Sequence, residues 1–270
     1  MSATDKVFAG SIPEFYDTYM VPLIFRVYAD DLAARVSEIR PSSVLETAAG
    51  TGVVTRALAR RLDPAARYVA SDLNHAMIDH AATRQPKDPA VEWRQADALD
   101  LPFAAEEFDV VLCQFGTMFF PDRSKGYAEA RRVLRPGGRY VFSVWDRIEN
   151  NELAHIVTEA VGTAFPEDPP RFLARTPHGY FDRDLIHGDL ERSGFSDIVI
   201  EHLEATSHVQ SPDMAAQAYC QGTPLRNEIE TRGPSMLEEL TDRVAAAIEA
   251  RFGEGPISSR ISAFVVTATK

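Results

Sequence analysis

The stretch from Val44 to Thr55, VLETAAGTGVVT, limits most strongly what this 270-residue chain can fold into. An apolar pair precedes Glu46, small residues fill positions 48–52 (AAGTG), and an apolar, helix-periodic segment starts at Val53. This pattern predicts a strand, a tight turn and a helix. A turn of small residues lets backbone approach a ligand closely, and the free N–H groups of a helix start point at it. We expect a ligand with a polar or anionic end; the alternative is a plain tight corner between strand and helix.

Strands and helices alternate along the following hundred residues. Five strands are predicted, each followed by a turn or a helix, at 44–46, 67–72, 91–97, 108–113 and 139–145, with helices at 53–62, 74–83 and 127–134. Such alternation implies βαβ units and a mostly parallel sheet with helices on both faces, an α/β fold. In these sheets ligands bind at the carboxyl ends of the strands.

The segments on either side of this alternation are mainly helical. Residues 1–40 are expected to be an N-terminal helical cover, with an aromatic entry segment that Pro13 and Pro22 break into short pieces. We expect residues 41–146 to form the ligand-binding core. Residues 147–270 should complete the sheet with strands at 196–201 and 261–269 and carry helical lid insertions at 147–194 and 206–258, the second with one break at Gly233-Pro234.

Composition restricts the classes of partner. The net charge is −12, with 28 basic and 40 acidic residues, which argues against nucleic acid and favours a small or cationic ligand. No apolar stretch is long enough to span a membrane, and the N-terminal residues lack the pattern of a signal peptide, so we expect a cytoplasmic protein with no membrane partner. Cys113 and Cys220 agree with a reducing compartment, and Cys113 is expected in the core.

Polar residues end four of the predicted strands: Glu46, Asp72, Asp97 and Gln114. A carboxylate at the end of the second strand can accept hydrogen bonds from a ribose diol. Asp97, with the backbone of Ala98, can read an adenine edge, and Glu46 can meet an ammonium group. Together they describe an adenosine with an amino-acid-like tail. Each has a simpler alternative, since Asp72 can cap a helix and Asp97 can be a turn residue.

These motifs make the chain resemble the class I S-adenosylmethionine-dependent methyltransferases, the broad group that includes the ubiquinone/menaquinone C-methyltransferases. The resemblance runs from about Pro13 to Asp146, and its motifs are VLETAAGTG, YVASDLNHAMI, VEWRQADALDLPF, FDVVLCQFGTMFFPD and RVLRPGGRYVFSVWD. It implies a Rossmann-like seven-stranded sheet whose seventh strand is antiparallel and lies beside the sixth. It also implies S-adenosylmethionine as cofactor, S-adenosylhomocysteine as product, and a small-molecule acceptor.

The resemblance also implies roles for individual residues. It places the loop around the methionine part of the cofactor, Asp72 and Leu73 at the ribose, and Met77 near the adenine. The remaining cofactor residues that it implies are Tyr16, Glu46, Ala48, Gly50, Thr51, Gly52, Asp97, Ala98, Gln114 and Phe115. Two features depart from the family pattern. Ala48 replaces the first glycine of the motif, so the backbone there should not need a glycine-only conformation, and the loop at 118–122 has no histidine.

Methyl transfer from a sulfonium needs no nucleophilic residue, and neither a catalytic residue nor a metal is assigned. If the acceptor must lose a proton, the candidate bases are His155, His178, His187 and Tyr180. Residues 169–181 and 212–252 are the expected substrate lid.

Two other hypotheses remain at this point. A nicotinamide-dependent oxidoreductase would have a third glycine in GxGxxG, which Val54-Thr55 does not supply, and a cofactor-binding protein without catalysis would share the same motifs. The acceptor and the oligomeric state are not indicated.

Overall fold

The computed structural model describes residues 12–85 and 91–270. The chain divides into two compact units. The first contains Met1–Phe25, Trp145–Tyr180 and Glu204–Ala263, and the second contains Arg26–Val144, Phe181–Leu203 and Phe264–Lys270. Each unit is therefore assembled from segments that are far apart in the sequence.

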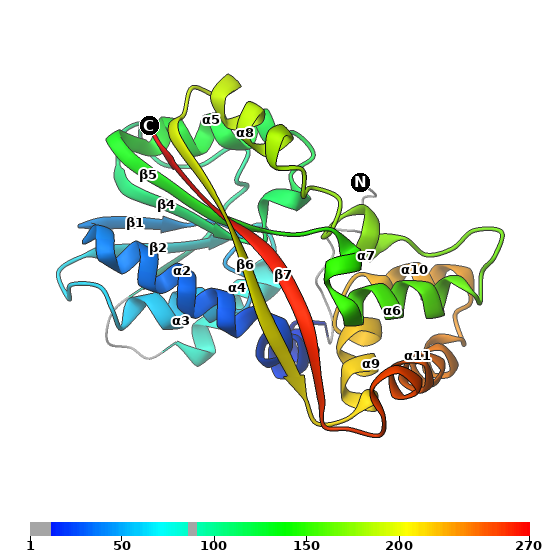
Figure 1. Ribbon diagram of the computed structural model, residues 1–270. Coiled ribbons are helices and arrows are strands. Elements are labelled where there is room, and N and C mark those ends of the chain that lie inside the picture. Colours follow the sequence, from blue (N-terminus) through cyan, green and yellow to red (C-terminus); the bar gives the residue numbers. More distant parts are fainter. Residues whose placement is uncertain (1–11, 86–90) are drawn as a thin grey trace. The chain divides into compact units, whose positions relative to one another are not determined.

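A seven-stranded sheet with the order β3-β2-β1-β4-β5-β7-β6 organises the second unit (Figure 1). Strands β1 to β5 pair in parallel. Strand β7 runs antiparallel to β5, because the Asp146 N–H bonds to the carbonyl of Ser262 while the Lys270 N–H bonds to that of Gly138. This confirms the predicted fold class. The bounds are β1 Ser43–Glu46, β2 Arg67–Asp72, β3 Glu92–Gln95, β4 Phe108–Gln114, β5 Leu134–Trp145, β6 Ser196–Val209 and β7 Ile257–Thr269.

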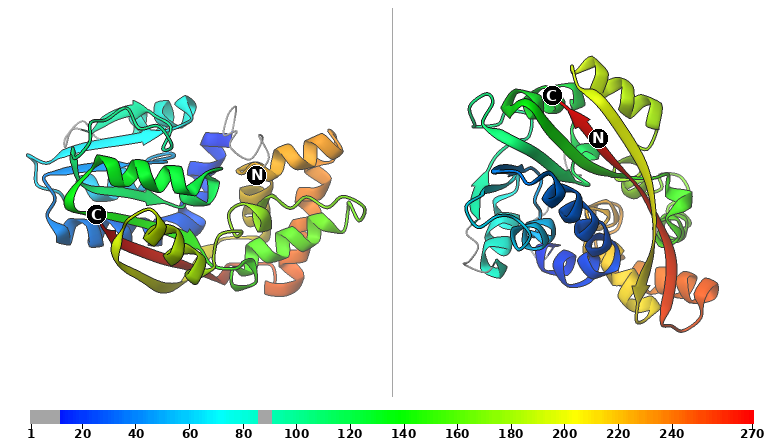
Figure 2. Two further views of the ribbon diagram at one scale, coloured as in Figure 1. Left: turned by 90° about the horizontal axis from the view of Figure 1, so that it is seen from above. Right: turned by 60° about the vertical axis from the view of Figure 1, so that its left-hand side comes forward.

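Helices cover both faces of this sheet (Figures 1 and 2). On one face, α2 (Arg26–Ile39) and α3 (Val53–Ala59) bury Leu32 and Leu58 in a core cluster with Val110 and Leu112 of β4. On the other face, Tyr127 of α5 (Arg123–Val133) packs its ring against those of β5. Helix α8 (Arg183–Arg192) packs against α5, and Gly194 beyond it has a left-handed conformation, with φ +83°. Helix α4 (His75–Arg84) follows β2.

The first unit is mainly helical. It contains α1 (Ile12–Phe15), the π-helix η2 (Tyr16–Phe25), η4 (Ile148–Asn150), α6 (Glu152–Gly162), α7 (Phe172–Arg175), α9 (Pro212–Gln221), α10 (Leu225–Arg232) and α11 (Leu237–Phe252). Two predictions were wrong. Pro22 lies inside η2 and does not interrupt it, because Val21 and Leu23 on either side of it are buried and this packing outweighs the local preference. The segment 212–252 has a second break, at Gly222–Pro224, where α9 ends.

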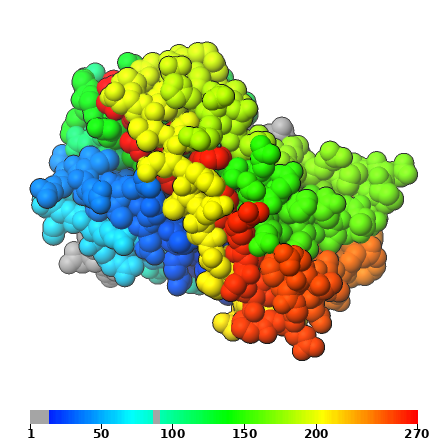
Figure 3. Space-filling model, in the orientation of Figure 1, coloured from blue at the N-terminus to red at the C-terminus, as the bar shows by residue number. Residues whose placement is uncertain are grey.

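The outer strand β6 lies at the surface of the face shown in Figure 3, and most of its side chains are exposed or half-buried. Both β6 and β7 extend further than the sequence predicts, by eight residues at the end of β6 and four at the start of β7. Among the described residues, no helix combines the length and the apolar character that a membrane crossing requires.

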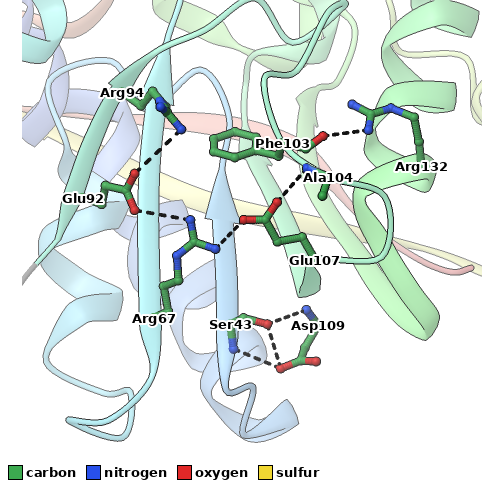
Figure 4. Close-up of polar contacts among 9 residues, drawn as sticks. All are labelled: Ser43, Arg67, Glu92, Arg94, Phe103, Ala104, Glu107, Asp109 and Arg132. Carbon is green, nitrogen blue, oxygen red and sulfur yellow. Dashed lines mark hydrogen bonds and ion pairs between the residues drawn. The ribbon is translucent and has the colours of Figure 1, made fainter.

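A polar network ties together the amino ends of β1 to β4 (Figure 4). Arg67 at the start of β2 pairs with Glu92 of β3 and with Glu107 before β4. Asp109 accepts from the backbone and the hydroxyl of Ser43, and Arg135 lies 2.6 Å from its other oxygen. Burial acts to raise the pKa of Asp109, but the hydrogen bonds from Ser42, Arg135 and Ser43 outweigh it and lower the pKa to about 2. The network fixes the strand starts, at the sheet edge opposite to the one where the strands end.

Candidate functional site

The loop between β1 and α3 takes left-handed backbone conformations at three positions. The φ angles are +52° at Ala48, +56° at Gly50 and +80° at Gly52. The expectation for Ala48 was therefore wrong, because alanine here occupies a region that favours glycine. Backbone bonds fasten this loop to its neighbours, from the Thr47 N–H to the Leu112 carbonyl and from the Ala49 N–H to the Ser71 carbonyl, both at 2.9 Å. The ends of β1, β2 and β4 therefore meet at one place.

Asp72 ends β2 beside this loop with its side chain buried. Its Oδ2 accepts from the Gly50 N–H at 2.9 Å, and its Oδ1 accepts from the Asn74 N–H at 2.8 Å. Burial raises the pKa of Asp72, and the two backbone bonds act in the opposite direction. Each carboxylate oxygen has two lone pairs, so Oδ2 has capacity for a second donor. The alternative that Asp72 caps the following helix was wrong, because the N-cap of α4 is Asn74 and Asp72 accepts from the N–H of that residue.

Glu46 ends β1 and is almost fully buried. Its Oε2 accepts from the Thr55 hydroxyl at 2.6 Å and from the Tyr68 hydroxyl. Burial raises the pKa of Glu46 to about 7, although both hydrogen bonds favour the ionised form. The described residues donate to Oε2 and not to Oε1, which leaves Oε1 for another group. The sequence analysis did not identify Tyr68 as the partner of Glu46, since a tyrosine in an apolar strand has no distinguishing pattern.

Known proteins resemble this chain in both sequence and fold. The model of the methyltransferase domain family matches residues 45–142. A demethylmenaquinone methyltransferase of Clavibacter sepedonicus is 40% identical over 106 residues, which are 39% of this chain and 42% of that enzyme. A ubiquinone/menaquinone biosynthesis C-methyltransferase of Burkholderia vietnamiensis is 32% identical over 168 residues, which are 58% of this chain and 69% of that enzyme.

The chain belongs to the class I S-adenosylmethionine-dependent methyltransferases, in the group of the ubiquinone/menaquinone C-methyltransferases. The fold agrees. An N-methyltransferase of Haemonchus contortus, solved with phosphomonomethylethanolamine and S-adenosylhomocysteine, superposes with a TM-score of 0.56 at 16% identity, covering 97% of this chain and 61% of its own. Membership of this family implies S-adenosylmethionine as the methyl donor.

The loop of this methyltransferase has the space and the polar groups that such a cofactor needs. A β-carbon added to Gly50 would meet no atom within 4 Å, so this backbone position is open to a ligand. The Thr51 hydroxyl is buried and has no hydrogen-bond partner among the described residues. The Asp72 carboxylate lies beside Gly50, whose N–H donates to it at 2.9 Å. A nucleoside with an amino-acid tail fits this donor and acceptor set.

The other predicted cofactor residues of the methyltransferase differ in their surroundings. Asp97 is exposed and accepts from the Leu99 N–H at 2.9 Å, so its turn role is observed, and its adenine role stays a prediction. The Ala96 N–H bonds to the Asp72 carbonyl at 3.0 Å, which brings the ends of β2 and β3 together. Ala98 beside Asp97 is half-buried. Leu73 is 42% exposed beside Asp72, whereas Met77 is buried on α4.

The end of β4 brings the remaining predicted residues of the second unit to the loop. Gln114 is half-buried and lies opposite Ser143 of β5. Phe115 has φ +52°, and its ring meets that of Tyr28 edge-on at 5.3 Å. After it comes Gly116, which sequence reasoning did not single out, and then η3 (Thr117–Phe119). The cofactor-binding roles of Gln114 and Phe115 stay predictions.

Tyr16 and three of the four candidate bases lie in the first unit. Tyr16 begins η2 and stacks on Phe25 with ring centroids 4.9 Å apart. His178 and Tyr180 are buried, whereas His155 is half-buried on α6. His187, on α8 of the second unit, pairs with Glu191. The cofactor-binding role of Tyr16 stays a prediction.

Proposed function

We propose that this methyltransferase binds S-adenosylmethionine at the carboxyl ends of β1 to β4 and transfers its methyl group in line to a small-molecule acceptor. The observation that supports this most strongly is the carboxylate of Asp72. It is buried, is oriented by the Gly50 and Asn74 N–H groups, and lies at the end of the strand next to the glycine loop. A buried carboxylate needs polar partners, and two ribose hydroxyls are suitable ones.

S-adenosylmethionine, when bound, supplies a methyl group that is attached to a positively charged sulfur. After the transfer this sulfur is part of a neutral thioether, the leaving group. The residues of the chain then have to bind the cofactor and orient it toward the acceptor. We assign the ribose to Asp72, the adenine edge to Asp97 and the Ala98 N–H, and the ammonium group to Oε1 of Glu46. The backbone at Gly50 admits the methionine part, because a β-carbon there would meet no atom within 4 Å.

Positioning accounts for the catalysis that we propose. Holding the acceptor atom and the methyl group in line converts a bimolecular step into an effectively unimolecular one, which is worth up to about 7–11 kcal/mol in favourable systems. The charged leaving group needs no further activation. The acceptor therefore has to be bound and oriented, and it has to lose a proton where methylation makes it acidic.

The relatives suggest which acceptors to test first. The Clavibacter and Burkholderia enzymes are named for demethylmenaquinone and for ubiquinone and menaquinone. We therefore propose a hydroxylated aromatic ring, the reduced form of a quinone, as the first acceptor class. The cytoplasmic location, the absence of a nucleic-acid partner and the lid role of residues 169–181 and 212–252 remain predictions.

A methyl-transfer assay tests this function. The full chain is incubated with S-adenosylmethionine labelled in its methyl group and with a panel of reduced quinones and phenols. We expect label in one acceptor class and an equal amount of S-adenosylhomocysteine. Tight cofactor binding without transfer to any acceptor would favour the cofactor-binding alternative instead. No cofactor binding would contradict the proposal as a whole.

A further inference from the structure

The two glycines of the loop after β1 have different surroundings. Gly50 is half-buried, and a β-carbon added to it would meet no atom within 4 Å. Gly52 is buried. A β-carbon added to it would lie 3.0 Å from Cη2 of Trp93, 3.2 Å from Nη1 of Arg56 and 3.2 Å from the β-carbon of Ala81. The loop is therefore open at Gly50 and packed against the protein itself at Gly52.

The groups that pack against Gly52 come from three elements of the second unit. Trp93 belongs to β3, Arg56 to α3 and Ala81 to α4. Trp93 lies opposite Ala70 of β2, and the methyl group of this alanine leaves room for the indole ring to extend from β3 toward the loop. Nη1 of Arg56 also donates to the Thr51 carbonyl at 2.6 Å. A ring and a guanidinium group thus hold the loop on its Gly52 side.

This packing supplies a restraint that the glycines lack. Gly52, with φ +80°, is the N-cap of α3, and its N–H bonds to the Ala49 carbonyl at 2.9 Å. Gly50, with φ +56°, directs its N–H to Oδ2 of Asp72 at 2.9 Å. Glycine adopts positive and negative φ with similar ease, so its own preference does not select one shape of the loop. Contacts with neighbouring side chains have to select it.

We propose that Trp93 is a positioning residue for the cofactor. Its indole ring packs against Gly52, which keeps the Gly50 N–H on Asp72 and the open side of Gly50 available to the methionine part of the ligand. This inference rests on the proposed function, and it adds to it a residue that acts through the loop. A loop that is already in its binding conformation binds more tightly, because it loses less conformational entropy when the ligand arrives.

The test compares S-adenosylhomocysteine with adenosine, which lacks the amino-acid tail. Both are titrated calorimetrically into the full chain, as wild type and as Trp93→Leu. Trp93→Leu should bind S-adenosylhomocysteine about tenfold more weakly, the loss of roughly one hydrogen bond. Adenosine should weaken less than about threefold, because the Asn74 N–H still orients Asp72. A purely structural role of Trp93 would leave the ratio of the two affinities in the folded protein unchanged.

Two further variants make the comparison specific. Phe108→Leu removes another aromatic ring from the same sheet, one that is fully buried at the amino end of β4. It should lower the free energy of unfolding but keep the wild-type ratio of affinities. Trp93→Phe keeps a shorter ring, so its ratio should lie between those of the wild type and Trp93→Leu. If Trp93→Leu does not fold, Trp93→Phe takes its place in the test.

Hydrogen exchange measures the position of the loop without any ligand. The Gly50 amide is protected by its bond to Asp72, and it can be followed by NMR in protein labelled with ¹⁵N-glycine. Local opening of the loop exposes this amide, so it should exchange about tenfold faster in Trp93→Leu. In Phe108→Leu the Gly50 amide should keep the wild-type rate.

Three results would overturn the proposal: an unchanged ratio of affinities in Trp93→Leu, an unchanged exchange rate of its Gly50 amide, or the same altered ratio in Phe108→Leu. Failure of the proposed function is a different result. In that case the wild type would bind neither S-adenosylhomocysteine nor adenosine, while exchange at Gly50 would still report whether Trp93 holds the loop.

Discussion

The β-carbon of Ala48 lies 2.5 Å from the place where a β-carbon on Gly116 would stand. The loops that follow β1 and β4 thus approach so closely that one of the two positions must lack a side chain. Cys113 Sγ lies 2.6 Å from the same place. The family motif usually has glycine where this chain has Ala48, so the space that the alanine methyl needs is provided by Gly116.

Gly116→Ala should destabilise the protein by about 1–3 kcal/mol, because the new methyl group overpacks against Ala48 and Cys113. The measurement is urea unfolding followed by circular dichroism. Gly162→Ala at the end of α6 is the control, since a β-carbon there would meet only Pro169, at 3.7 Å. The control should be neutral or slightly stabilising. Equal stability of the two variants would show that the loops do not interlock.

Ala48→Gly should restore part of the stability that Gly116→Ala loses. Alone, Ala48→Gly removes the backbone strain of an alanine in the left-handed region, which is worth roughly 1–2 kcal/mol. The glycine also makes the unfolded chain more flexible, so the net change in the free energy of unfolding should stay within about 1 kcal/mol. In the Gly116→Ala background it also removes the clash. The double-mutant cycle should give a coupling energy of roughly 0.5–3 kcal/mol. If the effects of the two substitutions on the free energy of unfolding were strictly additive, this would contradict a direct contact between positions 48 and 116.

Glu46 should make stability depend on pH near neutrality. Its pKa is raised from 4.5 to about 7 on folding, chiefly by burial, so the stabilising contribution is complete below pH 4.5 and is lost as the pH rises through 7. Glu46→Gln can still accept from Thr55 and Tyr68 but does not titrate. Its free energy of unfolding should therefore rise relative to the wild type between pH 4.5 and 8, by an amount on the order of 3 kcal/mol. If the free energies of unfolding of the two proteins changed in parallel with pH, the raised pKa of Glu46 would be disproved.

Asp109→Asn should reduce stability by roughly 1 kcal/mol at pH 7 once solvent screening is counted, without affecting the cofactor. The pKa of Asp109 is lowered to about 2, so its contribution is present above pH 3.8 and is lost as the pH falls through 2. The difference in free energy of unfolding between Asp109→Asn and the wild type, measured by urea unfolding, should shrink as the pH falls from 3.8 to 2. An altered affinity of Asp109→Asn for S-adenosylhomocysteine would mean that the amino ends of the strands are coupled to the cofactor site at their carboxyl ends.

Much of the second unit could be predicted because its pattern is local. The alternation of strands and helices, the small-residue turn and the carboxylate of Asp72 depend on neighbours in the sequence. The left-handed Ala48 could not be foreseen, since it depends on Gly116, which lies far along the chain. The same is true of the contact between Nδ1 of His178 and the backbone carbonyl oxygen of Asp146, which lies 32 residues earlier in the chain. Pro22 inside η2 shows how tertiary packing overrides a local breaker.

The most direct test of the account is the affinity of Asp72→Ala for S-adenosylhomocysteine, measured by isothermal titration calorimetry beside Asp109→Asn. Each charge-assisted hydrogen bond to the ribose is worth about 1.5–3 kcal/mol. We therefore predict that Asp72→Ala binds roughly ten- to a hundredfold more weakly per bond lost, while Asp109→Asn binds like the wild type. Wild-type affinity in a folded Asp72→Ala protein would contradict the assignment of the ribose to the end of β2.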